Sequence, residues 1–229
     1  MKRVAILQSN YIPWKGYFDL IASVDDFVFY DDVQYTKNDW RNRNKIKTPL
    51  GSCWLTIPVG GDIKRRICDV TFRSQRWRAD HWKTLEQNYR KAAAFSEIAA
   101  WLKPLYLDSA EISLSASNRA FVEAVCRYLN IGTRLSCSWD HPVVEGRTER
   151  LVAICGALGA SRYVTGPAAA AYLDASGFAR HGIAVEWFDY RGYPKYPQLW
   201  GEFDHHVTVL DLLFNCGRSA RKYMKSIVP

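Results

Sequence analysis

Short apolar runs alternate with longer amphipathic stretches in the first and last parts of the chain. Apolar runs at 3–8 and 27–31 flank residues 17–24, whose apolar positions recur at spacings of three and four, which predicts a strand, a helix and a second strand. The alternation resumes after residue 133 and favours a parallel sheet with right-handed crossovers. The later strands are expected at 134–138, 162–166 and 185–190, and the later helices at 148–159, 169–182 and 207–224.

The middle of the chain follows a different pattern. Residues 43–48 and 53–59 predict a β-hairpin whose turn contains Pro49 and Gly51, and 67–72 alternates like one further short strand. Spacings of three and four then predict helices. These helices are expected at 79–93, 95–108 and 115–130, with Pro104 kinking or dividing the second.

No linker rich in proline or serine separates these parts. We therefore expect one α/β domain over 1–229, with a Rossmann-like, mostly parallel sheet, a β-hairpin and a helical insert or layer at 73–130. A chain of 229 residues buries about 70% of its unfolded surface, so no disulfide or metal is needed to stabilise it.

Cysteine usage and hydropathy predict a cytoplasmic protein. The six cysteines fall singly, mostly in apolar runs, and no pair has the CxxC spacing, so we expect reduced thiols. The apolar run after the basic start is too short for a signal peptide, and no apolar stretch is long enough to span a bilayer.

The net charge of +8 favours an anionic partner: a nucleic acid, a membrane surface or a phosphorylated small molecule. No homeodomain, zinc-finger or RNP signature is present, and the GxGxxG and Walker A patterns are also absent. We expect a small anionic substrate, such as a sugar nucleotide or an acyl thioester, and no specific nucleic-acid partner. The sequence identifies no cofactor and no metal-ligand set.

Polar residues follow the first two expected strands. Ligands of parallel sheets bind beyond the carboxyl ends of the strands, so these residues are the first candidates for a site. Arg43 lies between two asparagines and could grip a diphosphate bidentately. Turn chemistry explains Asn10 and Gly16 singly, and a solvated loop explains the acids, but the whole set is less easily explained in this way. The candidates here are Gln8, Asn10, Tyr11, Gly16, Asp31, Asp32, Gln34, Asn42, Arg43 and Asn44.

Later segments add further candidates. Thr165 and Gly166 stand at a helix entrance, where they could receive phosphate or carboxylate, or serve as an N-cap and a turn glycine. The Pro-punctuated segment 192–203 holds Tyr193, Tyr196, Gln198 and Trp200, which suit stacking on a base or a sugar, or the packing of a surface loop.

Asp211 and Asn215 lie one turn apart in an apolar run, so they must find internal partners or act on a ligand; internal hydrogen bonding is the stronger interpretation.

His81 is the best general-base candidate, because histidine titrates near neutral pH, although a lone histidine on an amphipathic helix is usually packed or solvated. His205 and His206 are adjacent and make a poor metal site, since two ligands on a helix need a spacing of three or four. Cys216 could be a nucleophile, but its apolar context favours inert packing.

The N-terminal motifs resemble those of the WbqC-like protein family. The match is carried by Gln8, Tyr11, Pro13, Gly16 and Tyr17, by Asp31, Asp32, Val33 and Gln34, by Trp40, Asn42, Arg43 and Asn44, and by segments 163–178, 196–203 and 210–217. Many relatives have proline in place of Ser9 and some have histidine in place of Leu7, so we expect neither position to carry chemistry. The resemblance implies a role in the biosynthesis of O-antigen or another surface polysaccharide.

The order of strand, Pro/Gly loop, helix and strand also resembles the HIGH-motif nucleotidyltransferases. Their His-x-Gly-His element follows the first strand, and segment 13–17 of this chain keeps only the glycine. We therefore expect a related fold. Because this chain lacks the two histidines of the motif, nucleotidyl transfer is less well supported.

Three function classes remain. The first is a transferase that moves an acyl or aminoacyl group onto a nucleotide-activated or phosphorylated sugar; direct transfer needs positioning, a base and oxyanion donors but no Ser/His/Asp triad. The alternatives are a nucleotidyltransferase-like enzyme and a non-catalytic scaffold of glycan assembly. For the transferase we assign catalysis to Asp31, Asp32 and His81, and substrate binding to Gln8, Asn10, Tyr11, Gly16, Gln34, Asn42, Arg43, Asn44, Thr165, Gly166, Tyr196, Gln198, Asp211 and Asn215.

Overall fold

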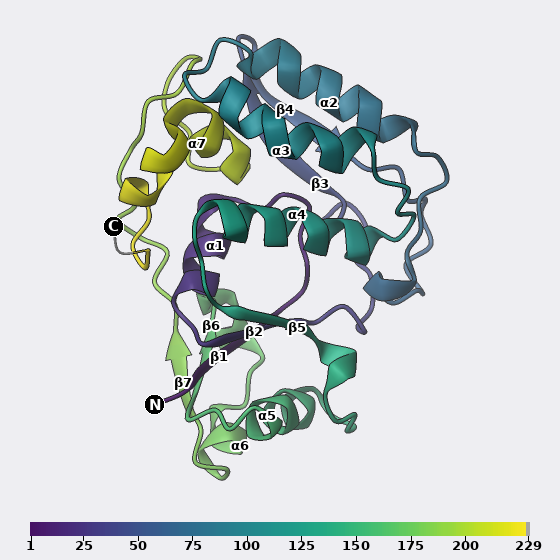
Figure 1. Ribbon diagram of the computed structural model, residues 1–229. Coiled ribbons are helices and arrows are strands. Elements are labelled where there is room, and N and C mark those ends of the chain that lie inside the picture. The colour runs from purple at the N-terminus through teal and green to yellow at the C-terminus, as the bar shows by residue number, and fades with distance from the viewer. Residues whose placement is uncertain (228–229) are drawn as a thin grey trace.

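The computed structural model describes residues 1–227 and contains a five-stranded parallel sheet (Figure 1). The strand order is β5-β2-β1-β6-β7, so the chain runs outward from β1 in one direction and later returns to the other side of β1. The point at which the direction reverses lies between β1 and β6, which is where such sheets bind ligands. The strands are β1 (Arg3–Leu7), β2 (Asp26–Phe29), β5 (Arg134–Cys137), β6 (Arg162–Thr165) and β7 (Ala184–Trp187).

Helices cover both faces of the sheet. Helices α1 (Lys15–Ala22) and α4 (Leu114–Tyr128) lie on one face, and α5 (Arg147–Ala157) and α6 (Ala175–Ala179) lie on the other (Figure 1). Val4 and Ile6 of β1 belong to the hydrophobic cluster of α5 and α6, whereas Ala5 belongs to the cluster of the opposite face. Burial on both faces explains why the strands appear in the sequence as continuous apolar runs.

The predicted hairpin forms a separate two-stranded antiparallel sheet. Strands β3 (Arg43–Thr48) and β4 (Gly51–Thr56) pair with Lys45 opposite Trp54, and Gly51 has the positive φ of 103° that its turn requires. Helices α2 (Arg76–Tyr89), α3 (Phe95–Leu107) and α7 (Val209–Cys216) surround it (Figure 1). Pro104 lies inside α3 without dividing it. The predicted α/β class, with a parallel sheet and a hairpin, is confirmed.

The expected strand at 67–72 is wrong. Ile67–Asp69 forms a 3-10 helix, and Thr71 contributes only an isolated bridge to Ser113. The backbone N–H groups of Ile67 and Cys68 donate to the carbonyl oxygens of Val33 and Asp31, so this segment is tied to the loop after β2 instead of to a neighbouring strand.

Two expected long helices are also interrupted. The segment 169–182 consists of a 3-10 helix, Pro167–Ala171, and the short α6, because the side chain of Asp174 caps a new helix by accepting from the Ser176 N–H. The last helix ends at Cys216, where Gly217 has a φ of 53°, and continues as a 3-10 helix, Gly217–Tyr223. One further 3-10 turn, Ser138–Asp140, follows β5.

A buried polar cluster anchors the loop after β1 in the core. The Tyr11 hydroxyl lies 2.8 Å from Nδ1 of His81 and 2.7 Å from the hydroxyl of Tyr106. The His81 ring also forms a hydrogen bond with the backbone of Thr56. Burial lowers the pKa of His81 to about 4, so the ring is neutral at physiological pH.

This burial predicts an acid-sensitive stability. The pKa of His81 is near 6.5 in the unfolded chain and about 4 in the folded one, so between these values only the unfolded state binds the proton. The free energy of unfolding should therefore fall as the pH drops from about 6.5 to about 4, by roughly 3 kcal/mol from this group. Denaturant titrations across this range should give a shallower pH dependence for His81→Gln than for the wild type. His206→Gln, at an exposed position, should keep the wild-type dependence, and an unchanged slope in His81→Gln would contradict the assignment.

Candidate substrate-binding site

A cavity of about 660 Å³ opens where the loops after β1 and β7 meet. Both loops leave the carboxyl ends of parallel strands, with β6 between them in the sheet, as expected for a ligand site of this fold. The segment before α7 and the start of the hairpin complete the wall. The lining residues are Asn10, Pro13, Trp14, Trp40, Asn44, Tyr190, Arg191, Gly192, Tyr193, His205 and His206.

Much of the wall is aromatic. The indole of Trp14 lies with its centroid 5.4 Å from the ring of Tyr190 and 5.6 Å from that of Tyr193. A Cβ at Gly16 would lie 2.3 Å from the Trp14 ring, so only glycine lets this indole fold over the first turn of α1. Gly16 therefore shapes the wall through Trp14.

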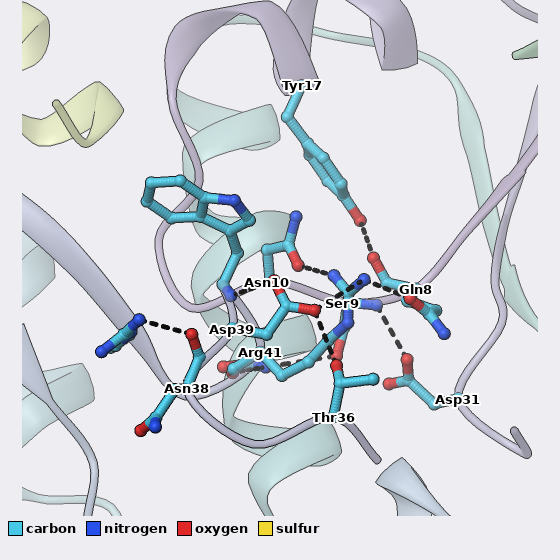
Figure 2. A network of polar contacts seen from close by, with 12 residues as sticks. Gln8, Ser9, Asn10, Tyr17, Asp31, Thr36, Asn38, Asp39 and Arg41 are labelled. Carbon is cyan, nitrogen blue, oxygen red and sulfur yellow. Dashed lines mark hydrogen bonds and ion pairs between the residues drawn. The ribbon is translucent and has the colours of Figure 1, made fainter. Parts of the chain in front are cut away.

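A buried arginine orients one polar group of the wall. Figure 2 shows the Arg41 guanidinium donating to the side-chain oxygens of Asn10 and Gln8. Because a guanidinium only donates, Asn10 must turn its oxygen toward Arg41 and its NH₂ group away from it. That NH₂ group has no partner within residues 1–227, so it is available to donate to a ligand oxygen. The nearest carboxylate oxygen to Arg41, from Asp39, is 3.9 Å away.

The loop behind the wall has a strained backbone. Ile12 has a φ of 41°, which is costly for a β-branched residue. Its carbonyl oxygen accepts from Nδ2 of Asn44 and Oγ1 of Thr208, each at 2.7 Å, and Nδ2 of Asn44 also donates to the Tyr11 carbonyl at 3.0 Å. Asn44 thus holds the loop in position while forming part of the cavity.

Two histidines face the cavity. The Nδ1 atom of His205 is buried and has no hydrogen-bond partner within the described residues, 1–227. Burial and the positive charge of Lys15 lower the pKa of His205, which keeps its ring neutral and able to accept a proton at pH 7. His206 is exposed, with Nδ1 3.2 Å from Oδ1 of Asp204.

An exposed arginine lies at the rim of the cavity. The side chain of Arg191 is 91% exposed and pairs with Oδ1 of Asp189 at 2.9 Å. Surface pairs of this kind contribute little to stability, so the guanidinium can exchange its carboxylate for a ligand phosphate.

The two acids after β2 do not line this cavity. Asp31 is fully buried and accepts from the Ser9 N–H at 2.8 Å and from the Ser115 hydroxyl. Asp32 pairs with Arg150 at 2.8 Å and accepts from the Ser138 hydroxyl. Each carboxylate has internal donors, so the solvated loop considered as the alternative explanation does not describe them, and the assignment of Asp31 and Asp32 to catalysis stays a prediction.

Several other candidates are hydrogen-bonded inside the protein. Asp211 accepts from the Tyr89 hydroxyl and from Nε2 of Gln198, each at 2.8 Å, and burial raises the pKa of its carboxyl. The same Gln198 nitrogen donates to the Tyr196 hydroxyl at 3.0 Å, and Asn215 donates to the Asp211 carbonyl at 2.8 Å. Gln198 and Asp211 link the segment before α7 to Tyr89 of α2, whereas the Asn215 hydrogen bond lies within α7. None of Tyr196, Gln198, Asp211 and Asn215 lines the cavity.

The remaining candidates also lie outside the cavity wall. Gln34 donates to the Ile63 carbonyl at 3.1 Å, Asn42 donates to the Ile57 carbonyl at 2.9 Å, and Arg43 lies over Trp54. Thr165 is buried, and Gly166 lies against Tyr190. His81 and Tyr11 belong to the buried cluster described above. Of the predicted binding residues, Asn10 and Asn44 line the cavity, and Gln8 and Gly16 act on it through Arg41 and Trp14.

Sequence reasoning missed most of the aromatic and basic wall. It noted Tyr193 as a stacking residue but considered His205 and His206 only as metal ligands. The signal that could have found most of the others is their place in the loops after the first and last strands, whereas Trp40 follows the second strand. These residues are Trp14, Trp40, Tyr190, Arg191, His205 and His206.

The described part of the chain, 1–227, holds no group of three His, Cys, Asp or Glu residues placed to bind a metal ion. None of its helices has the length and hydropathy to cross a membrane.

Comparison with known proteins identifies the family. The chain is 52% identical over 227 residues to the uncharacterized protein Rv1507c of Mycobacterium tuberculosis (strain ATCC 25618 / H37Rv), and the match covers 98% of each chain. No solved structure is significantly similar. The model of the WbqC-like protein family matches residues 8–223, so the chain belongs to the WbqC-like protein family.

Proposed function

We propose that the protein is a transferase that binds a nucleotide-activated or phosphorylated sugar in the cavity and moves an acyl or aminoacyl group onto it. The observation that carries this proposal is the cavity of about 660 Å³, which combines aromatic walls, an oriented amide donor and a neutral imidazole at the carboxyl ends of the strands. Its volume is in the range of small-molecule sites.

The aromatic walls suit the flat parts of such a ligand. A nucleobase or the apolar face of a sugar can stack on Trp14, Tyr190 or Tyr193, and the NH₂ group of Asn10 can donate to a phosphate or hydroxyl oxygen.

Positive charge around the cavity favours phosphate. Arg41 lies behind Asn10, Arg191 stands at the rim, and Nζ of Lys15 lies 5.1 Å from the centre of the Tyr193 ring. Among residues 1–227, no aspartate or glutamate lines the cavity. Focused positive potential of this kind attracts anionic substrates and raises their local concentration.

His205 is the proposed general base. A hydroxyl or amine of the bound sugar attacks the carbonyl carbon of an acyl thioester while His205 takes its proton; the new C–O or C–N bond forms, the C–S bond breaks, and the thiolate leaves with that proton. The link between the WbqC-like family and surface-polysaccharide biosynthesis supports a sugar as the acceptor.

Ligand binding tests the cavity. In a thermal-shift screen of sugar nucleotides, sugar 1-phosphates and coenzyme A esters, a ligand present at 100 times its Kd should add about 2.7 kcal/mol of stability. Asn10→Asp should weaken binding of the best sugar nucleotide at least tenfold, because it replaces the NH₂ donor with a carboxylate that repels phosphate. Asn130→Asp adds the same charge outside the cavity and should bind normally. Equal affinities for the two variants would contradict the proposed site.

Turnover tests the base. His205→Gln should lower kcat at least 100-fold and leave the Kd of the sugar ligand within twofold, whereas His181→Gln, outside the cavity, should turn over normally. Because burial and Lys15 lower the pKa of His205, the midpoint of the fall in wild-type rate on acidification should lie below pH 6.5, as the ring becomes protonated. Undiminished turnover by His205→Gln would exclude this base.

A further inference from the structure

Two tryptophans form an exposed aromatic surface beside the cavity. Trp40 is 43% exposed and Trp54 is 40% exposed, and their ring centroids lie 5.5 Å apart with the planes tilted by 36°. Trp54 belongs to β4, and Trp40 precedes β3. Water-exposed indoles in contact with each other are unusual on a surface without a binding role.

Two cations lie over the same surface. The guanidinium carbon of Arg43 is 4.4 Å from the centre of the Trp54 ring, and Nζ of Lys45 is 5.0 Å from it. The hairpin register places Lys45 opposite Trp54, and Arg43 lies two residues earlier on the same face. Neither cation forms a direct ion pair within residues 1–227; the Arg43 guanidinium donates to the Asn38 carbonyl oxygen, and its charge helps to lower the pKa of the Asp39 carboxyl.

The surface is continuous with the cavity. Trp40 lines the cavity and also contacts Trp54. Asn44 lies between Arg43 and Lys45 on β3, so it points to the opposite side, where it holds the loop after β1. One face of β3 therefore contributes to the cavity, and its other face contributes to the tryptophan surface.

We propose that Trp40, Trp54, Arg43 and Lys45 bind an acidic sugar chain, which runs from the mouth of the cavity across the hairpin. Indole faces stack on the C–H faces of sugar rings, and the two cations pair with carboxylate or phosphate groups along the chain. Binding of the sugar chain does not depend on the proposed function; only the idea that this sugar chain is part of the acceptor rests on it. Single-stranded nucleic acid also stacks on aromatic rings beside cations, but a surface of two rings that leads into a small-molecule cavity fits a sugar chain better.

Calorimetric titration of the full chain tests this inference. The probes are tetragalacturonate for carboxylates, a phosphorylated pentamannose for phosphates, neutral maltotetraose, and oligo(dT) as the nucleic acid. At least one acidic sugar should bind at least tenfold more tightly than maltotetraose and oligo(dT), with affinity that falls as salt rises.

Variants locate the binding. Trp54→Leu and Lys45→Ala should each weaken binding of the acidic probe at least fivefold. Trp54→Phe keeps an aromatic ring, so it should weaken binding less than Trp54→Leu does. Trp139→Leu is the matched control, because Trp139 is 42% exposed and has the guanidinium carbon of Arg119 5.3 Å from its ring, yet lies outside the cavity and the hairpin. Trp54→Leu and Trp139→Leu should lower the melting temperature by similar amounts, since the two indoles are 40% and 42% exposed.

Four outcomes would overturn the inference: no acidic sugar binds, maltotetraose binds as tightly as the acidic sugars, oligo(dT) binds most tightly, or Trp54→Leu behaves like Trp139→Leu. Failure here is distinguishable from failure of the proposed function. Asn10→Asp affects the cavity and should leave tetragalacturonate binding intact, whereas Trp54→Leu affects the hairpin and should leave sugar-nucleotide binding intact.

Discussion

The buried guanidinium of Arg41 fixes the geometry on which the cavity depends. Its side chain binds the amide oxygens of Gln8 and Asn10, and its backbone carbonyl accepts from Nδ2 of Asn118 at 2.8 Å, so one residue joins the loop after β1 to the segment before β3 and to α4. Removing a guanidinium from water costs several kcal/mol unless its donors find acceptors. Here the closest acceptors are the neutral amides of Gln8 and Asn10, and the carboxylates of Asp39 and Asp31 act on the guanidinium from farther away.

The carbonyl of Ile12 is the second point at which distant segments meet. Asn44 of the hairpin and Thr208 at the start of α7 both donate to it, although they lie 32 and 196 residues away in the sequence. A residue with φ of 41° persists only when its surroundings fix it from several sides. The hairpin and α7 therefore act as supports for a single strained loop, and this explains why segments so far apart in the chain build one cavity.

The sheet was predictable because its strands are buried on both faces, which leaves uninterrupted apolar runs such as 3–8 and 27–31. The errors have a different origin. Segment 67–72 alternates like a strand, but its backbone partners lie in the loop after β2, and no local pattern specifies a long-range partner. The helix start at Asp174 could have been predicted, since aspartate is a common N-cap and small residues follow it. The helix end at Gly217 could also have been predicted, since glycine commonly terminates helices.

The sequence predicted the location of the candidate site better than it predicted the residues that line it. The cavity opens at the carboxyl ends of the strands, the region that the sequence indicated, and Asn10 and Asn44 line it there. Asp31 and Asp32 are equally close in sequence to a strand end, but Ser115 of α4 and Arg150 of α5 turn them inward, and neither contact can be read from local sequence. This difference has a chemical consequence. Two further carboxylates facing the cavity would repel a phosphorylated ligand, whereas carboxylates held by internal donors add no such repulsion to the wall that Arg191 and the oriented Asn10 amide provide. The burial of the acids after β2 is thus part of what makes the neighbouring cavity suitable for an anion.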